Sequence, residues 1–392
     1  MANTRKHRYP VCPDSAILPL VEMKQMPIHC HLLRPARAEA VRAPRGDIRL
    51  GYFPECGHIY NLDFDPALVA YTQTYENSLH FSERFQQYAT AVARYLVDEY
   101  DLRRKKIIEI GAGRGDFLLM LAQMGDNWGT GFDPSYVPDA ACPENVTFIQ
   151  DFYSEKYAGY QADLIVCRHT LEHIADPDAF VSLIRRAVAG RADSVIFFEV
   201  PNALFTLRQL GIWDIIYEHC SYFSPVSLAR LFRRHGFRVL RVRERFGGQF
   251  LTIEATPAEN TAVPAAGEQA ELAQMAVDAA GFAEKFRQKV AWWRQTLARA
   301  AGNGRKIVVW GAGSKGVTFL NVLSAGDIIP YVVDINPRKQ GMFVAGTGQR
   351  IVPPSFLATY QPDIVIVMNA NYKDEIQEKL REIPCEAEIM LA

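Results

Sequence analysis

Short apolar runs alternate with stretches of helical periodicity between Lys106 and about Pro257. The runs KKIIEI, WGTGFDP, NVTFIQD, ADLIVCRHT and SVIFFEVP have the length of strands, whereas DFLLMLAQM and DPDAFVSLIRRAVAG have the length and period of helices. Strands that alternate with helices indicate right-handed crossovers and a sheet with helices on both faces. The pattern therefore predicts a doubly wound α/β domain.

A second alternating block follows a long helical stretch. Residues 260–267 have the composition of a linker, and residues 268–302 combine strong helix formers with apolar positions about 3.6 residues apart. They predict a long helix or a helix pair that ends at Gly302 and Gly304. From Lys306 the runs KIVVWGAGSKGVTFL, IPYVVDINPRK and PDIVIVMN repeat the order of strand, glycine turn and helix. This pattern predicts a second nucleotide-fold domain.

Composition narrows the class of protein. The chain has 392 residues, of which 49% are hydrophobic and 22% charged, which is a globular balance. A net charge of -1 argues against binding nucleic acid through phosphate neutralisation. Because no run of 18 apolar residues occurs and the N-terminus has no signal-like apolar stretch, we expect a cytoplasmic protein without membrane spans. The seven scattered cysteines then favour reduced thiols.

A glycine-rich loop, EIGAGRGDF, directly follows the first strand of the central block. Gly111, Gly113 and Gly115 allow a sharp turn and a close approach to a ligand, and the next helix presents its N-terminal N–H groups. The spacing is tighter than the G-x-G-x-x-G of dinucleotide loops. With Glu109 before it, the loop resembles the first motif of class I S-adenosylmethionine-dependent methyltransferases.

Supporting residues follow at successive strand ends. Asp133, twenty residues after Gly113, can accept both ribose hydroxyls, and Asp151 can accept from the adenine amino group with Phe152 against the ring. A reading in which the acids only cap helices leaves this order unexplained. The predicted donor-binding residues are Glu109, Gly111, Gly113, Gly115, Asp133, Pro134, Asp151, Phe152, Arg168 and His169.

The second loop, WGAGSKG, has the full G-x-G-x-x-G spacing at Gly311, Gly313 and Gly316, with Asp334 twenty-one residues after Gly313. Alone it would indicate a dehydrogenase. The short remainder of the chain shows no other parts of a hydride-transfer site. Binding of NAD, binding of the nucleotide part of a substrate, and the absence of any ligand therefore stay open.

Together, CRHTLEHI, YEHCSYFS and GAGSKG resemble the sugar C-methyltransferase family of bacterial deoxysugar pathways. The resemblance implies a small N-terminal domain (1–70), a class I methyltransferase domain with a doubly wound sheet (71–258), a helical connector (268–303) and a C-terminal Rossmann-like α/β domain (304–392). It also implies S-adenosylmethionine as cofactor and a nucleotide-linked keto sugar as the leading acceptor. O- or N-methylation of another natural-product intermediate is the alternative.

The family's general base carries over to His219, with Glu218 beside it to orient the ring or raise its basicity. Ile216 and Tyr217 stand where the family has tyrosine and histidine. If the acceptor is a carbon next to a carbonyl, the enolate needs a donor, for which Tyr217, Tyr222 and Asn202 are candidates. The predicted catalytic residues are His219, Glu218, Tyr217 and Tyr222.

Other readings of His219 remain. A nucleophilic pair with Cys220 is disfavoured because adjacent side chains point in different directions on a strand or helix. A metal site formed by Glu218, His219 and either His169 or His173 stays open, as does a purely structural role; for His173 we expect capping or packing.

The stretch YTQTYENSLHFSERF predicts a lid over the donor, or alternatively an amphipathic helix on the core. The predicted substrate-binding residues are Tyr75, Ser78, Asn202, Gly313 and Lys315.

The family's zinc site uses two C-x-x-C pairs, which here read CPDS and FPEC. Half of each pair is missing, so we expect no zinc; the candidate ligands in this segment are Cys12 and Cys56, which could recruit Cys30, His31 or His58. Three function classes follow: a small-molecule methyltransferase, an NAD-dependent oxidoreductase that uses the second loop, and a non-catalytic protein that has kept the donor pocket. The sequence gives no oligomeric state.

Overall fold

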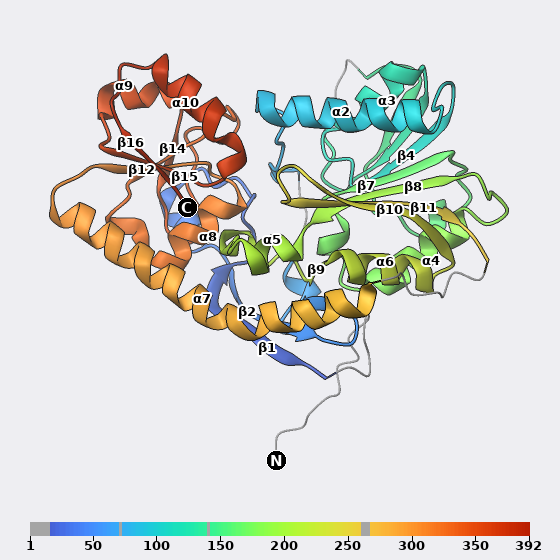
Figure 1. The fold of residues 1–392 in the computed structure, drawn as a ribbon. Helices are drawn as coiled ribbons and strands as arrows, with labels where there is room; N and C mark the ends of the chain where they lie inside the picture. The colour runs from blue at the N-terminus through green and yellow to red at the C-terminus, as the bar shows by residue number, and fades with distance from the viewer. Residues whose placement is uncertain (1–15, 70–72, 139–141, 260–266) are drawn as a thin grey trace.

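The computed structural model describes residues 16–69, 73–138, 142–259 and 267–392, and these residues form three sheets (Figure 1). The predicted linker at residues 260–267 lies outside the described residues except for Gly267. No helix in these four ranges combines the length and apolar character that a membrane span requires.

The N-terminal sheet is antiparallel and takes one strand from the central region. Ile59 pairs with Tyr222 and Tyr60 with Ser221, so the segment around His219 is attached to this sheet. A short helix, α1 (Arg37–Val41), lies between the first two strands in the sequence. The sheet has the order β1-β2-β3-β9, with β1 (Leu18–Pro27), β2 (Arg45–Phe53), β3 (His58–Asn61) and β9 (Ser221–Tyr222).

The central sheet has seven strands, and its first five along the chain are parallel, as the sequence predicts. The last two form an antiparallel hairpin on the edge beside β8. The order is β10-β11-β8-β7-β4-β5-β6, with β4 (Lys106–Ile110), β5 (Trp128–Phe132), β6 (Val146–Ile149), β7 (Leu164–Arg168), β8 (Val195–Pro201), β10 (Phe237–Arg245) and β11 (Phe250–Pro257).

Helices cover both faces of this sheet, because successive side chains of a strand point to opposite faces. On β4, Ile107 packs in the core formed with α2 and α3, whereas Ile108 packs in the core formed with α4 and α6. The doubly wound prediction is therefore confirmed. These helices are α2 (Glu83–Glu99), α3 (Asp116–Gly125), α4 (Pro177–Ala187) and α6 (Pro225–Arg234).

The C-terminal sheet is entirely parallel, which confirms a second Rossmann-like domain. Its order is β14-β13-β12-β15-β16, with β12 (Ile307–Trp310), β13 (Tyr331–Val333), β14 (Arg350–Val352), β15 (Ile364–Val367) and β16 (Glu388–Leu391). Its helices are α8 (Ser314–Leu323), α9 (Leu357–Tyr360) and α10 (Lys373–Arg381).

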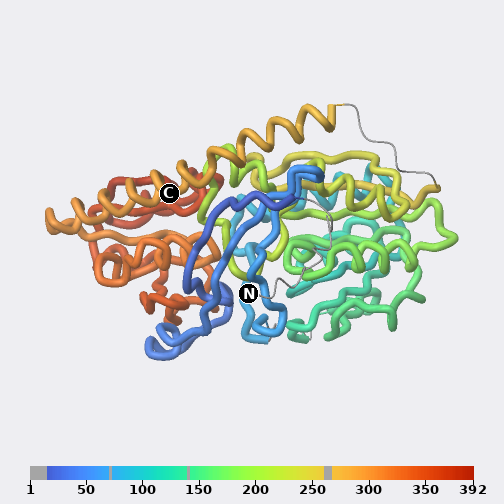
Figure 2. The backbone as a smooth tube through the Cα atoms, turned by 90° about the horizontal axis from the view of Figure 1, so that it is seen from below, coloured from blue at the N-terminus to red at the C-terminus, as the bar shows by residue number. Residues whose placement is uncertain are grey.

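A single helix, α7 (Glu268–Gly302), connects the central and C-terminal regions, so the predicted helical connector is one helix of 35 residues. It runs below both regions and along the N-terminal sheet (Figures 1 and 2). Met275 and Trp293 on its inner face belong to one core with residues of the N-terminal sheet and of α8. The helix therefore packs on both the N-terminal sheet and the C-terminal region.

Short helices occupy many of the connections. They are α5 (Ala203–Arg208), η1 (Pro66–Leu68), η2 (Glu155–Tyr157), η3 (Leu171–His173), η4 (Ile212–Asp214), η5 (Ala325–Asp327), η6 (Pro354–Phe356) and η7 (Ala370–Tyr372). Two of them matter for the site, because η3 follows β7 and η4 lies just before His219.

Candidate active site

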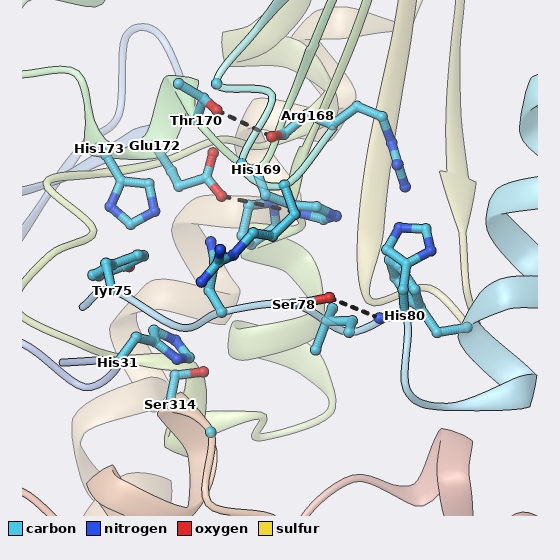
Figure 3. Close-up of a pocket in the computed structure, with 18 of the residues that line it drawn as sticks. His31, Tyr75, Ser78, His80, Arg168, His169, Thr170, Glu172, His173 and Ser314 are labelled. Atoms are coloured by element: carbon cyan, nitrogen blue, oxygen red, sulfur yellow. Dashed lines mark hydrogen bonds and ion pairs between the residues drawn. The ribbon is translucent and has the colours of Figure 1, made fainter. Parts of the chain in front are cut away.

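A cavity of about 610 Å³ lies where the strand ends of the central and C-terminal sheets face each other. Residues from both glycine-rich loops, from the segment 75–82 and from η3 line it. Figure 3 shows His31 and Ser314 on one side of this space and Arg168, His169 and Thr170 across from them. The two glycine loops of the sequence therefore open into one cavity.

The first loop has the turn geometry that glycine allows. Gly111 has φ 72°, and a Cβ there would lie 1.9 Å from the Thr170 hydroxyl oxygen. Gly113 has φ 56° and donates its N–H to Asp133 at 2.8 Å. A Cβ added at Gly113 would meet no atom within 4 Å. Gly115 begins α3 but does not line the cavity. A ligand can therefore approach the backbone closely at Gly113.

Two acids stand beside this loop and line the cavity. Burial raises the pKa of Glu109 to about 8, and its Oε2 has no hydrogen-bond partner in the described part of the chain. Asp133 also accepts from the backbone N–H and hydroxyl of Ser135, at 2.7 and 2.6 Å, and Pro134 follows it in the cavity wall. Asp133 is thus held rigidly at the end of β5.

The next strand end presents an acid and an exposed ring. The Tyr157 hydroxyl donates to Asp151 at 2.6 Å and Lys156 lies 3.2 Å away; both lower the pKa of Asp151. Phe152 is 58% exposed although it is a large apolar side chain, and both residues line the cavity. An exposed ring in a cavity wall can cover a flat aromatic ligand.

Arg168 and His169 also line the cavity, but a carboxylate that the sequence analysis did not single out holds both. Glu199 on β8 accepts from Arg168 at 2.8 Å and lies 2.9 Å from His169 Nε2. Burial opposes ionisation of Glu199, yet the guanidinium of Arg168 lowers its pKa to about 2. Arg168 also stacks over Phe117 at 4.1 Å. Arg168 and Glu199 therefore form a buried ion pair in this wall of the cavity, next to His169.

His219 lines the cavity, as its predicted role requires. Burial, followed by the neighbouring His173 and His31, lowers the pKa of His219 well below 6.5. The ring is therefore neutral at neutral pH and can accept a proton. Its Nδ1 is buried and has no hydrogen-bond partner among the described residues.

Glu218 does not orient His219. It is fully buried, accepts the backbone N–H of Cys30 at 2.9 Å and lies 3.1 Å from Nδ1 of His29. Burial raises its pKa, but the hydrogen bond with His29, the nearby His31 and His173 and the hydrogen bond from Cys30 together lower the pKa below its ordinary value, so the carboxyl group is ionised. Glu218 is not among the cavity residues, and its carboxyl group contacts the N-terminal segment at His29 and Cys30; its predicted catalytic role stays a prediction.

Tyr217, Tyr222 and Asn202 also lie outside the cavity lining. The Tyr217 hydroxyl accepts the backbone N–H of Asp65 at 3.0 Å, and the Tyr222 hydroxyl lies 3.2 Å from both backbone N and O of Ile216. Asn202 caps α5 and donates to a backbone carbonyl at 2.9 Å. These hydroxyl and amide groups are therefore turned to the backbone and not to the cavity, and their predicted role beside an enolate stays a prediction.

Two residues of η3 form a cluster with His219. A carboxylate oxygen of Glu172 and one ring nitrogen each of His173 and His219 lie within 4.8 Å of one another, a donor set that could hold a metal ion. The metal site considered from the sequence used Glu218 in place of Glu172. Burial raises the pKa of Glu172 to about 8. The second histidine of CRHTLEHI was the available signal for this cluster.

The segment before α2 crosses the cavity as extended chain, so the predicted amphipathic helix begins only at Glu83. Tyr75 and Ser78 both line the cavity, as expected of a lid. The Tyr75 ring packs edge-on against His31 at 5.5 Å, and the Ser78 hydroxyl accepts the His80 backbone N–H at 3.4 Å (Figure 3).

The C-terminal loop completes the cavity with Gly313 and Lys315. Lys315, at the start of α8, forms an ion pair with Asp214 of η4. Asp334 accepts the backbone N–H of Ala312 and that of Asn336, both at 2.8 Å. Asp334 is therefore held by its own loop at the end of β13, as Asp133 is at the end of β5.

The predicted metal candidates do not form a described site. Cys12 lies outside the described residues, and Cys56 is disulfide-bonded, so the expectation of reduced thiols is wrong at that position. A disulfide sulfur is not the thiolate that zinc binds. The described free cysteines are Cys30, Cys142, Cys167, Cys220 and Cys385.

Two family models match the chain. Residues 80–242 match a methyltransferase domain, and residues 250–388 match the C-methyltransferase C-terminal domain. With the sheet order described above, the chain has the domain content of a methyltransferase enzyme and the class I fold of S-adenosylmethionine-dependent methyltransferases.

Similar proteins point in the same direction. The C-methyltransferase NovU of Streptomyces niveus is 29% identical over 233 residues, which cover 56% of this chain and 54% of NovU. A ubiquinone biosynthesis O-methyltransferase of Escherichia coli is 31% identical over 107 residues, which cover 25% and 43%. The chain spans about half the length of the curated relatives it matches.

Among solved structures, magnesium protoporphyrin IX methyltransferase of Synechocystis with bound S-adenosylhomocysteine is 20% identical. The similarity covers 45% of this chain and 84% of that one, with a TM-score of 0.36.

Proposed function

We propose that this methyltransferase transfers the methyl group of S-adenosylmethionine to a carbon atom of a small-molecule biosynthetic intermediate, with a nucleotide-linked keto sugar as the leading acceptor. The observation that carries the proposal is the single cavity that contains the first glycine loop, His219 and the C-terminal glycine loop. The match to a C-methyltransferase C-terminal domain and the similarity to NovU support carbon as the acceptor atom.

The donor half of the cavity fits S-adenosylmethionine. Gly113 leaves room for close approach, Asp133 can accept the ribose hydroxyls, and the exposed Phe152 can cover the adenine. The unpartnered Oε2 of Glu109 provides a further acceptor at the loop. Side chains without a partner around an open backbone are typical of a ligand site.

His219 is the proposed general base. The sulfonium of the donor supplies an activated methyl group, so the protein has to align the reactants and remove a proton from the acceptor carbon. Alignment can contribute on the order of 7 to 11 kcal/mol, and a positioned base about 10²- to 10⁴-fold. A neutral imidazole in the cavity wall supports this role.

O- or N-methylation of another natural-product intermediate is the second candidate. It is favoured by the buried Ile216 at the position where sugar C-methyltransferases have tyrosine, and by Tyr217, whose hydroxyl is engaged by backbone. An acceptor with a different outline from a keto sugar would suit these changes.

Calorimetry with S-adenosylhomocysteine and with NAD tests the proposal at the level of the donor. We expect the thioether to bind and NAD not to bind. Binding of NAD alone would indicate an oxidoreductase that uses the C-terminal loop, and would contradict the proposal. Binding of the thioether without transfer to a nucleoside diphosphate-linked 4-keto sugar would exclude that acceptor.

A further inference from the structure

We propose that Glu172, and not the adjacent Glu218, is the carboxylate that positions His219 by accepting its Nδ1–H, so that Nε2 faces the acceptor. This inference rests on the proposed function, in which His219 is the base. The similarity to C-methyltransferases does not assign this role to Glu172, which lies 47 residues before His219.

Two complementary atoms are left unsatisfied at this point. Nδ1 of His219 and Oε2 of Glu172 are both buried, and neither has a hydrogen-bond partner among the residues that the structure describes. One carboxylate oxygen of Glu172 and one ring nitrogen of His219 lie within 4.8 Å of each other, so the two side chains are neighbours. Since a buried polar atom without a partner costs about 1 to 3 kcal/mol, a small rotation that joins the two atoms stabilises both.

The backbone holds the two segments together on both sides of His219. The N–H of Cys220 donates to the carbonyl of Glu172 at 2.9 Å, and the Cys220 thiol lies 3.3 Å from the same oxygen. On the other side, the ring of His173 hydrogen-bonds to the backbone of Glu218. These contacts therefore fix the backbone of the segment that carries Glu172 next to that of the segment that carries His219.

The other nearby carboxylates are committed elsewhere. Glu218 is turned to His29 and Cys30, Glu199 pairs with Arg168, and Asp214 pairs with Lys315. Oε1 of Glu172 lies 3.9 Å from Nδ1 of His169, whereas its Oε2 is buried and has no hydrogen-bond partner over the described ranges.

The chemistry of the pair is that of a carboxylate and an imidazole. When Nε2 takes the proton from the acceptor carbon, the C–H electron pair stays on the acceptor, which attacks the methyl group. The ring becomes an imidazolium, and a Glu172 oxygen that accepts the Nδ1–H fixes the tautomer that leaves Nε2 free. A carboxylate that only fixes the tautomer of a histidine can change turnover by about 10⁴-fold.

The test compares Glu172→Gln with the matched variant Glu218→Gln, with S-adenosylhomocysteine bound. Nitrogen NMR of histidine-labelled protein reports the tautomer of His219, which is assigned by the signal lost in His219→Ala. We expect the Nδ1–H tautomer in the wild type and in Glu218→Gln, and its loss in Glu172→Gln. This readout requires no knowledge of the acceptor.

Turnover with a nucleoside diphosphate-linked 4-keto sugar gives the second readout. We expect Glu172→Gln to lower the rate about 10²- to 10⁴-fold with unchanged thioether affinity, and Glu172→Asp to recover part of it. An unchanged tautomer and rate in Glu172→Gln, with a rate lost in His219→Ala, would overturn the inference but leave the proposed function. Full turnover in His219→Ala would instead remove the base itself.

Metal analysis tests the alternative that Glu172, His173 and His219 bind a metal ion. One equivalent of a divalent cation in the purified wild type that is lost in both Glu172→Gln and His219→Ala would mean that Glu172 and His219 are metal ligands. That result would overturn the inference, because a metal-bound His219 nitrogen could not donate to Glu172. Metal-free protein with the expected tautomer would support the pair.

Discussion

The central and C-terminal regions contain the same arrangement, a glycine loop held by an acid, with different side chains around it. In each, the acid at the end of the second strand accepts an N–H of the glycine loop at 2.8 Å: Asp133 from Gly113, and Asp334 from Ala312. The two loops open into one cavity from opposite sides. The two sheet edges at which ligands bind in nucleotide folds therefore face each other across one cavity.

The side chains around the two loops differ. Beside the first loop the cavity carries the exposed ring of Phe152 with Arg114 and Arg168, whereas beside the second it carries Lys315 and Lys339, each next to an acid. The ring suits the flat base of a nucleoside, and lysines suit an acceptor with negative charge. The glycine loop and its acid therefore determine where a ligand binds, and the side chains around the loop determine which ligand binds.

The largest expected effect on S-adenosylhomocysteine affinity comes from adding a methyl group to one glycine loop at a time. A Cβ at Gly111 would lie 1.9 Å from the Thr170 hydroxyl, and one at Gly316 would lie 2.0 Å from the carbonyl of Gly311. We expect Gly111→Ala to weaken S-adenosylhomocysteine binding at least about 100-fold, a loss of about 2.7 kcal/mol. Gly316→Ala should leave that affinity within about threefold, as measured by calorimetry. Equal losses in both variants would contradict separate roles for the two loops.

Replacing the acid beside each loop should show a smaller difference in thioether affinity between the two regions. Asp133→Ala should lower thioether affinity about tenfold or more, because hydrogen bonds to a charged group contribute roughly 1.5 to 3 kcal/mol. Asp334→Ala should leave it unchanged. If Asp334→Ala weakened the thioether as much as Asp133→Ala, the donor would have been assigned to the wrong half of the cavity.

Lys315 of the second loop tests whether this side of the cavity binds the acceptor. Lys315→Ala should raise KM for a nucleoside diphosphate-linked 4-keto sugar about tenfold while leaving the affinity for the thioether unchanged. Lys156→Ala is the matched control, because Lys156 is a cation on the donor side that does not line the cavity. An unchanged KM in Lys315→Ala would remove the charge argument for the acceptor.

The smallest expected effect is on stability. The pKa of Glu109 is about 8 in the folded protein, above its ordinary 4.5, so between these values the folded state binds a proton that the unfolded state releases. Its contribution to stability is present below 4.5 and is lost as pH rises through about 8. We expect Glu109→Gln to lose less melting temperature than the wild type between pH 6.5 and 9, by a few degrees. A parallel loss in both proteins would contradict the buried, neutral carboxyl group.

Most of the fold could be predicted from the sequence, because local patterns determine it. The five parallel strands of the central sheet, the second Rossmann-like sheet and α7 follow from the spacing of apolar residues, glycines and helix formers. Pairing of Ser221 with Tyr60 could not be predicted, because β9 has two residues and its partner lies far away in the sequence.

The candidate site was predictable where strand ends determine it and not where distant partners do. The donor residues follow the strand order, and most of them line the cavity. The direction of Glu218 depends on His29, which lies 189 positions away, and no local pattern reveals that contact. Tyr217 and Tyr222 carry hydroxyl groups that look reactive in sequence but are engaged by backbone in the fold.

The most direct test is methyl transfer from a donor with a carbon-13 methyl group to a nucleoside diphosphate-linked 4-keto sugar, followed by NMR of the product. The account predicts a labelled methyl group on the carbon beside the carbonyl in the wild type, and a rate at least about 100-fold lower in His219→Ala with donor binding intact. Label on oxygen or nitrogen, or full transfer by His219→Ala, would contradict it.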